Sequence, residues 1–109
     1  MYVVLTYINN VNVQLSRRAE KSLYDVPKHV AVNFFVWRRE VETHGIEETR
    51  KLAGYHDEPL KGRLKGIRSV RLGRGYRAYY RMLTGQVKVV LLEDINKHDY
   101  KQIERLFGY

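Results

Sequence analysis

The sequence predicts an α+β fold in which helices come first and a strand meander follows. Three observations support this fold class. An apolar stripe with helical spacing occupies the first half of the chain, and three runs with the side-chain period of a strand occupy the second half. The helical and strand-like segments do not alternate along the chain. A length of 109 residues is typical of one domain, and we expect residues 1–109 to form it.

The most strongly predicted element is a helix that starts near Pro27 and ends at Gly45, because proline fits a first turn and glycine a helix end. Its apolar side chains recur at helical spacing, and we expect them to form core: Val30, Phe34, Trp37 and Val41, with Ala31 and Phe35 widening the stripe. A shorter helix is predicted over 16–24 with Ser16 as its N-cap, and a further short segment over 46–53.

Strands are predicted at both ends of this helical region. Asn9-Asn10 suits a tight turn, which makes residues 1–10 a possible extra N-terminal strand in a hairpin. The hairpin strands are 2–8 and 11–15, and the later strands are 64–72, 76–83 and 86–93. The last run is almost continuously apolar, as expected for an interior strand. A short C-terminal helix with Ile103, Leu106 and Phe107 closes the chain.

Basic residues outnumber acidic ones by eight, and the whole excess lies within residues 61–81, which contain no acid. These basic residues are Lys61, Arg63, Lys65, Arg68, Arg71, Arg74, Arg77 and Arg81. So concentrated a charge attracts polyanions, which makes nucleic acid the leading partner. A basic face that serves solubility alone is the alternative.

Strand alternation predicts where part of this charge points. If Val70 and Leu72 face the helices, Arg71 faces away from them, and on the next strand Arg77, Tyr79 and Arg81 share that open face. Guanidinium groups bind phosphate oxygens and tyrosine rings stack on unpaired bases, so this face is typical of a surface for single-stranded nucleic acid. Alternatively, Arg81 only extends along the sheet edge to solvent.

Other chemistry is weakly represented. The chain has no cysteine, and its four histidines lie far apart, so neither a disulfide nor a metal site is predicted. No run approaches the ~18 apolar residues of a membrane helix, and the N-terminus lacks the features of a secretion signal, which favours a cytoplasmic protein without a membrane partner. His56-Asp57-Glu58 can supply a base or cap a turn.

Four segments together resemble the RelE/ParE toxin superfamily, and most nearly its RelE/HigB-like mRNA interferases. They are Tyr55-His56-Asp57-Glu58-Pro59-Leu60-Lys61-Gly62, Arg68-Ser69-Val70-Arg71-Leu72, Gly75-Tyr76-Arg77-Ala78-Tyr79-Tyr80 and Asn96-Lys97-His98-Asp99-Tyr100. The resemblance extends from about Val11 to the C-terminus. Residues 1–10 precede the family's usual first strand, so they are an added strand or a peculiarity of the start site.

The resemblance implies a RelE-like fold, with N-terminal helices packed on a twisted antiparallel sheet and a short C-terminal helix. It implies a toxin that cleaves messenger RNA without metal or other cofactor, often in the ribosomal A site, and that a cognate antitoxin protein inhibits. The rival activities are a ParE-like DNA gyrase inhibitor, which binds protein without catalysis, and an RNA-binding module that does not cut. All three share the sheet and the charge.

The resemblance also assigns roles. Arg77 matches the family's phosphate-stabilising arginine and Arg71 a position used on the substrate backbone, while His98 is assigned to acid/base work and Tyr100 to positioning or base stacking. The general base stays open, because Ser69 stands where some members have a lysine, and Lys65, Arg68 or Lys97 can complete the set. The candidate RNA-binding residues are Lys61, Arg63, Lys65, Arg68, Arg74, Tyr79, Arg81 and Lys97.

Overall fold

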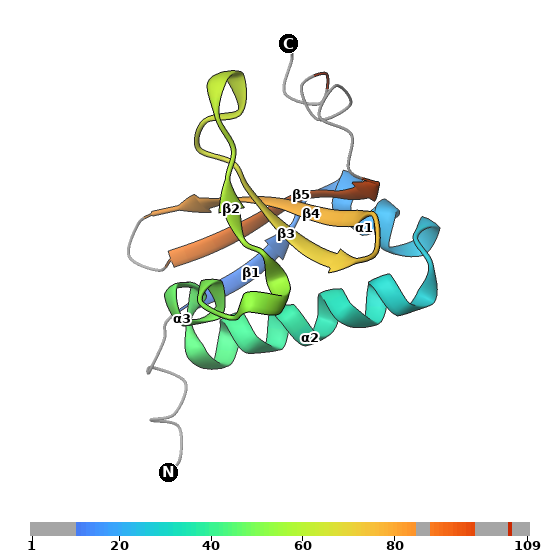
Figure 1. The fold of residues 1–109 in the computed structure, drawn as a ribbon, viewed down its shortest axis with the longest axis horizontal. Helices are drawn as coiled ribbons and strands as arrows, with labels where there is room; N and C mark the ends of the chain where they lie inside the picture. Colours follow the sequence, from blue (N-terminus) through green and yellow to red (C-terminus); the bar gives the residue numbers. More distant parts are fainter. Residues whose placement is uncertain (1–10, 85–87, 98–104, 106–109) are drawn as a thin grey trace.

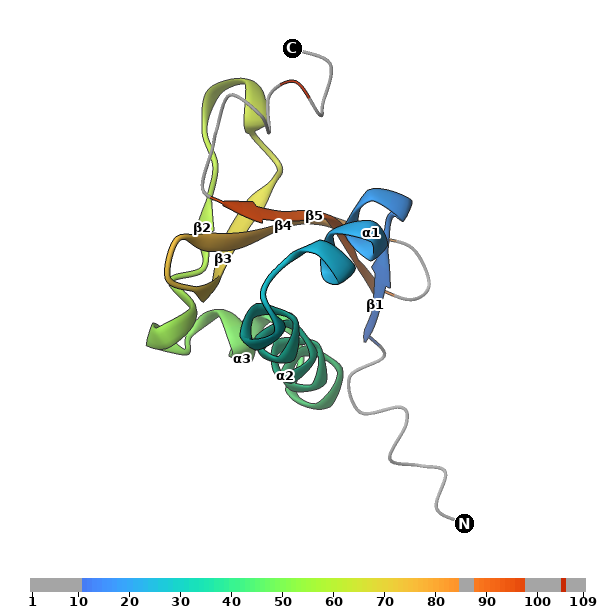
Figure 2. The ribbon, with the colours of Figure 1, turned by 90° about the vertical axis from the view of Figure 1, so that its right-hand side faces the viewer.

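The structure, a computed structural model, describes residues 11–84, 88–97 and 105. The helices are α1 (Arg17–Asp25), α2 (Lys28–His44) and α3 (Ile46–Arg50), with short 3₁₀ turns η2 (Ala53–Tyr55) and η3 (Gly62–Leu64). The strands are β1 (Val11–Leu15), β2 (Glu58–Pro59), β3 (Arg68–Gly73), β4 (Tyr76–Leu83) and β5 (Lys88–Lys97), in the spatial order β1-β5-β4-β3-β2. The helices cover one face of this sheet (Figures 1 and 2).

The helices form where the sequence predicts them. The Ser16 hydroxyl accepts a hydrogen bond from the Ala19 amide at 3.1 Å, which confirms Ser16 as the N-cap of α1. On α2 the four residues of the predicted stripe, from Val30 to Val41, are fully buried against the sheet. Phe35 is 53% exposed, so its expected place in that stripe is wrong. None of the described helices is long and apolar enough to span a membrane.

The sheet combines the predicted meander with one parallel edge. β4 pairs antiparallel with β3 and β5, and β5 is interior, as predicted. β1 pairs parallel with β5, so the sheet is mixed rather than antiparallel throughout. The helices that follow β1 supply the crossover that parallel neighbours require. The predicted strand 2–8, residues 86–87 and nearly all of the closing helix lie outside the described residues.

The connection between β2 and β3 differs from its prediction. β3 begins at Arg68 rather than at residue 64, because residues 60–67 fold back as an arm that projects from the sheet on the side away from the helices (Figure 1). Gly62 and Gly66 have φ angles of 64° and 98°, which only glycine adopts readily, and they allow the chain to reverse. β2, in a stretch predicted to be turn, pairs with β3 just before this arm.

The arm carries a second, smaller apolar cluster. Its side chains Leu60, Leu64 and Ile67 pack together with Tyr79 of β4. Tyr79 alternates with Ala78 and Tyr80 of the main core, so it lies on the sheet face opposite the helices, as strand alternation predicts. The arm nevertheless covers its ring completely, leaving it 0% exposed. The prediction that Tyr79 offers an open ring for base stacking is therefore wrong.

Replacement of Tyr79 tests this packing. Tyr79→Ala is expected to lower the free energy of unfolding by about 3–5 kcal/mol, because it removes a buried ring from a small cluster. Tyr24→Ala is the matched control, since Tyr24 is 89% exposed, and its effect is expected within about 0.5 kcal/mol. Urea denaturation measures both. Equal effects of the two substitutions contradict a structural role for Tyr79.

Candidate functional site

The two arginines singled out by strand alternation face each other across neighbouring strands. Arg71 of β3 and Arg77 of β4 are register partners, so their side chains emerge on the same face of the sheet. Both line an open concavity of about 250 Å³ together with His56, Glu58 and Tyr76. The surface therefore gathers two guanidinium groups, an imidazole, a carboxylate and an aromatic ring around one hollow.

Hydrogen bonds hold the guanidinium group of Arg77 in place. Its Nε donates to the Ser69 hydroxyl, and its Nη2 donates to the backbone carbonyls of His56 at 2.7 Å and of Ser69 at 3.1 Å. The described contacts engage Nε and Nη2 but not Nη1. Arg77 is thus pre-oriented, with its Nη1 group outside these hydrogen bonds and able to donate to an oxyanion.

A buried carboxylate anchors the segment that contacts Arg77. The Asp57 side chain is only 1% exposed and lies 2.6 Å from the Arg68 Nε, while the Tyr80 hydroxyl donates to its other oxygen at 2.5 Å. Burial, and then the hydrogen bond to Asp57, raise the pKa of Tyr80, so its hydroxyl stays protonated and remains a donor. His56, next to this anchor, has a φ of 44° and directs its carbonyl to Arg77.

Arg68 belongs to this anchor and not to the open face. It is the register partner of Tyr80 and alternates with Arg71, which places it on the helix side of β3 with Val70 and Leu72. Its charge is balanced there by Asp57. A buried carboxylate thus already engages the Nε of Arg68, while its predicted roles in RNA binding and in the catalytic set stay predictions.

Arg81 does lie beyond Tyr79 on the open side of β4, but it is paired. Its Nε is 2.6 Å from a carboxylate oxygen of Glu93 on β5, and the Arg81 side chain is 47% exposed. An ion pair with a neighbouring strand, rather than extension along an edge, accounts for its position. Because Glu93 balances its charge, Arg81 adds little to the net positive charge available for binding RNA.

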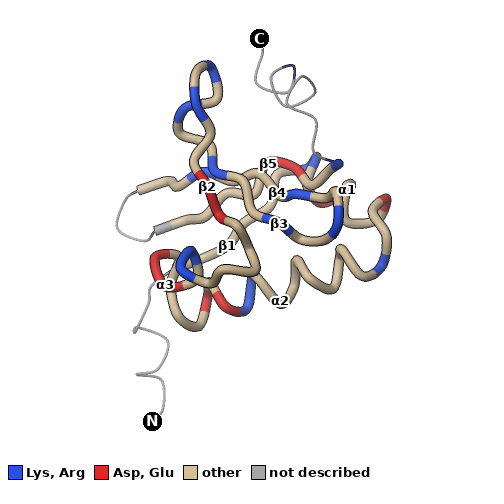
Figure 3. The backbone as a smooth tube through the Cα atoms, viewed as in Figure 1, with Lys and Arg blue, Asp and Glu red and all other residues tan. Residues whose placement is uncertain are grey.

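The remaining basic candidates border the open face at different places. Figure 3 shows basic residues along the arm and at the turn between β3 and β4. Those of the arm are Lys61, Arg63 and Lys65, that of the turn is Arg74, and all four are exposed. Lys97, the last residue of β5, is the register partner of Tyr76 and has its Nζ 6.0 Å from the centre of that ring.

The predicted closing residues His98 and Tyr100 lie outside the described residues. Within the described part, β5 ends beside Tyr76, which lines the concavity. The same part of the chain contains no group of three His, Asp or Glu side chains placed to hold a metal ion.

Three residues of the concavity were not among the site residues predicted from the sequence. His56 and Glu58 were considered only within a triplet that can supply a base or cap a turn, and Tyr76 was not considered as a surface ring. The short pairing of β2 with β3, which sets Glu58 opposite Ser69, brings the carboxylate to the hollow. Its position directly before the Pro59-Leu60-Lys61-Gly62 motif is the sequence feature that could have identified it.

Comparisons with known proteins establish the fold. No protein-family model matches the sequence, and no curated protein matches it either. Among solved structures, it is similar to an archaeal RelE-RelB complex from Pyrococcus horikoshii (22% identity, TM-score 0.61, 81% of this chain and 94% of that chain), the RelBE2 toxin-antitoxin complex from Mycobacterium tuberculosis (20%, 0.59, 80% and 96%) and YafQ from E. coli (17%, 0.63, 80% and 92%). The chain therefore has the fold of the RelE/ParE toxin superfamily.

Paired substitutions test the anchor around Asp57. Arg68→Ala is expected to lower the free energy of unfolding by about 3–5 kcal/mol, because it leaves a buried carboxylate without its partner. Asp57→Ala is expected to cost less, since the Arg68 side chain is 23% exposed and can reach water. The double variant is expected to cost less than the sum of the two.

The ion pair of Arg81 with Glu93 is the control for this cycle. Arg81 is 47% exposed and Glu93 13% exposed, more than Arg68 and Asp57, so Arg81→Ala is expected to lower the free energy of unfolding less than Arg68→Ala does. Chemical denaturation of all variants provides the measurement. If the unfolding free-energy changes of Asp57→Ala and Arg68→Ala add up exactly in the double variant, the proposed interaction between Asp57 and Arg68 is contradicted.

Proposed function

We propose that this protein is the toxin of a type II toxin-antitoxin system, a metal-independent endoribonuclease that cleaves messenger RNA on the ribosome in the cytoplasm. One observation carries the proposal: Arg71 and Arg77 meet in a single concavity with Glu58 and His56. The fold adds support, because the structures most like this chain include RelE, YafQ and YoeB proteins.

The proposed reaction uses the RNA's own nucleophile. The 2′-hydroxyl attacks the adjacent phosphorus, the new bond from the 2′-oxygen to phosphorus forms, and the bond to the 5′-oxygen of the next nucleotide breaks. One group must take the proton of the 2′-hydroxyl, another must protonate the departing 5′-oxygen, and cations must stabilise the charge on the phosphorane. The products are a 2′,3′-cyclic phosphate and a 5′-hydroxyl.

In this scheme Arg77 stabilises the phosphorane. Its guanidinium group is already oriented by Ser69 and by the His56 carbonyl, so little reorganisation is needed when negative charge develops. Arg71, opposite it on β3, binds a non-bridging oxygen of the same or the neighbouring phosphate.

We assign proton transfer to the acidic and imidazole groups of the site. Glu58 is the proposed general base, because its exposed carboxylate lines the hollow with both arginines. His98 is the proposed acid and Tyr100 the proposed positioning residue, on the basis of the family resemblance. His56 is the alternative base within the same hollow.

A cognate antitoxin is the proposed protein partner. Solved structures similar to this chain include toxin-antitoxin complexes, among them the complexes from Mycobacterium tuberculosis and Pyrococcus horikoshii. We propose that the antitoxin inhibits by covering the basic face with an acidic or amphipathic segment. Loss of RNA affinity in the complex is the corresponding observation.

Substitutions in the concavity test the activity. Arg77→Ala is expected to slow cleavage by about 10²–10³-fold through lost charge stabilisation, and Glu58→Gln by about 10²–10⁴-fold through loss of the base. Arg81→Ala is the control with an unchanged rate, because Glu93 already pairs with Arg81. Inducible expression followed by mapping of transcript 5′-ends measures cleavage, and breaks in frame with codons indicate dependence on the ribosome.

The same experiment separates the rival activities. Transcripts that stay intact while replication stalls contradict the nuclease and favour a gyrase inhibitor. Transcripts that stay intact without growth arrest, together with RNA binding, favour a binding module. Cleavage that persists in both Arg77→Ala and Glu58→Gln rejects the assigned site.

Salt dependence tests which cations contact RNA. Basic residues of the arm, of the β3–β4 turn and of the concavity border the open face, so the slope of log affinity against log salt is expected near −4 for single-stranded RNA, which corresponds to about six neutralised phosphates. Arg74→Ala is expected to reduce the slope by about 0.7, whereas Arg81→Ala changes it less because of Glu93. Fluorescence anisotropy with a labelled RNA measures both. Equal slopes for Arg74→Ala and Arg81→Ala contradict the prediction that Arg74 contacts RNA phosphate while Arg81 is already paired with Glu93.

A further inference from the structure

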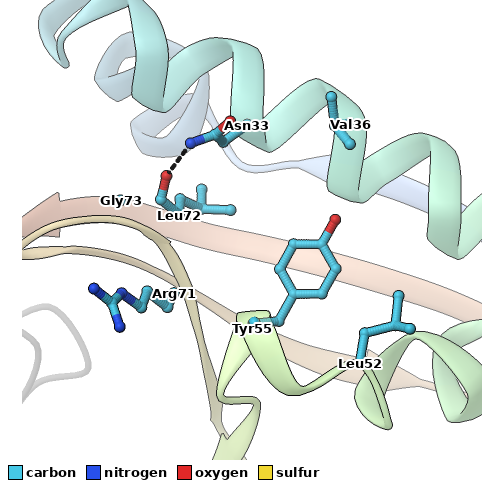
Figure 4. Close-up of a pocket in the computed structure, with 8 residues that line it drawn as sticks. Asn33, Val36, Leu52, Tyr55, Arg71, Leu72 and Gly73 are labelled. Carbon is cyan, nitrogen blue, oxygen red and sulfur yellow. Dashed lines mark hydrogen bonds between the residues drawn. The ribbon is translucent and has the colours of Figure 1, made fainter.

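A second hollow lies on the other side of Arg71. Its volume is about 320 Å³, and it opens between α2, the η2 turn and the end of β3 (Figure 4). Asn33 and Val36 come from α2, Leu52 and Tyr55 from the segment after α3, and Leu72 and Gly73 from β3. None of these residues has a role in the chemistry proposed above.

The walls of this hollow are mainly apolar but include two polar groups. Val36 and Leu52 are 51% and 45% exposed, so both present apolar surface to the hollow. Between them stands the Tyr55 ring, directed toward α2 (Figure 4). The Asn33 side chain is fixed at the edge, because its Nδ2 donates to the Leu72 carbonyl at 2.7 Å. A flat apolar ligand with polar edges fits such walls.

The hollow adjoins the proposed cleavage site. Arg71 and Gly73 line both hollows and form the rim between them. In Figure 4 the Arg71 side chain extends away from Tyr55, so its charge serves the neighbouring concavity while its strand borders this one. Gly73 contributes no side chain of its own to this rim, and the side chains of Val30 and His29 lie close to it.

We propose that this hollow is a subsite for a nucleobase of the RNA, namely the base next to the phosphate held by Arg71 and Arg77. The proposal rests on the proposed function and adds a determinant of affinity and sequence preference to it. In a nucleotide the base and the phosphate lie on opposite sides of the sugar. A phosphate at the arginines therefore directs a neighbouring base toward the apolar walls.

Charge favours a base over an anionic ligand. Burial, and then the nearby Glu40 carboxylate, raise the pKa of Tyr55, so the phenol is neutral under physiological conditions. The Tyr55 ring can stack on a base, and its hydroxyl and the Asn33 carboxamide can hydrogen-bond to base edges. Arg71, at the rim, is the one charged residue among the described residues that line this hollow, and Arg77 lines only the neighbouring concavity, where the phosphate is expected.

The test combines protein variants with RNA that lacks one base. The probes are a 2′-O-methyl trinucleotide, which cannot be cleaved, and two versions of it with an abasic residue at either end. The wild-type protein is expected to bind one abasic version about tenfold more weakly than the intact probe, since a stacked base contributes about 1–3 kcal/mol. The affected end shows on which side of the phosphate the subsite lies.

Val36→Glu places a carboxylate in the wall and is expected to abolish this tenfold discrimination. Val32→Glu is the matched control, because Val32 lies on the same helix, is 48% exposed and does not line the hollow. It adds the same charge and is expected to retain the discrimination. Leu52→Glu, on a different element, is a second variant expected to behave like Val36→Glu.

Three results overturn the subsite. The first is equal binding of the intact and both abasic probes by the wild type, and the second is an equal effect of Val36→Glu and Val32→Glu on base discrimination. The third is loss of antitoxin binding in Val36→Glu while base discrimination stays intact. The last result assigns the hollow to a protein partner. Binding is measured without cleavage, so the outcome is distinguishable from failure of the nuclease proposal. Base discrimination in a protein that cuts no RNA supports the subsite and rejects the nuclease.

Discussion

The arrangement of the candidate site depends on one buried carboxylate. Asp57 accepts from Tyr80 and pairs with Arg68, and these contacts fix the short segment 56–58 against the sheet. Because that segment is fixed, the His56 carbonyl reaches Arg77, and β2 places Glu58 opposite Ser69. A charge on the helix side of the sheet thus determines the geometry on the open side, and the guanidinium group of Arg77 is oriented before any ligand binds.

Ion pairing with carboxylates also divides the basic residues of 61–81 into two groups. Arg68 and Arg81 are neutralised by Asp57 and Glu93, which lie outside the run, whereas Arg71 and Arg77 meet at the concavity. The positive field of the open face therefore comes from fewer cations than the run contains. Of those that remain, Arg71 and Arg77 line the hollow, and the others lie on the arm and at the β3–β4 turn.

Much of this organisation follows from local rules. The 3.6-residue period places Trp37 in the core, and strand alternation brings Arg71 and Arg77 to one face. Alternation from Val70 also puts Arg68 on the helix side, a consequence that charge counting alone obscures. The burial of Tyr79 could not be predicted in this way, because it depends on an arm of eight residues folding over the strand. Long-range contacts, unlike periodicity, leave no regular spacing in the sequence.

Different elements build the two hollows, and this separation has a functional consequence. The register of β3 with β4, an interior pairing of the sheet, sets the positions of Arg71 and Arg77. The walls of the second hollow come largely from exposed side chains of α2 and of the segment before β2, which change without disturbing the sheet. In the proposed nuclease, phosphate binding is thus constrained by the fold, whereas preference for a neighbouring base is free to vary. Selectivity among RNA sequences can then evolve while the phosphate-binding geometry is kept.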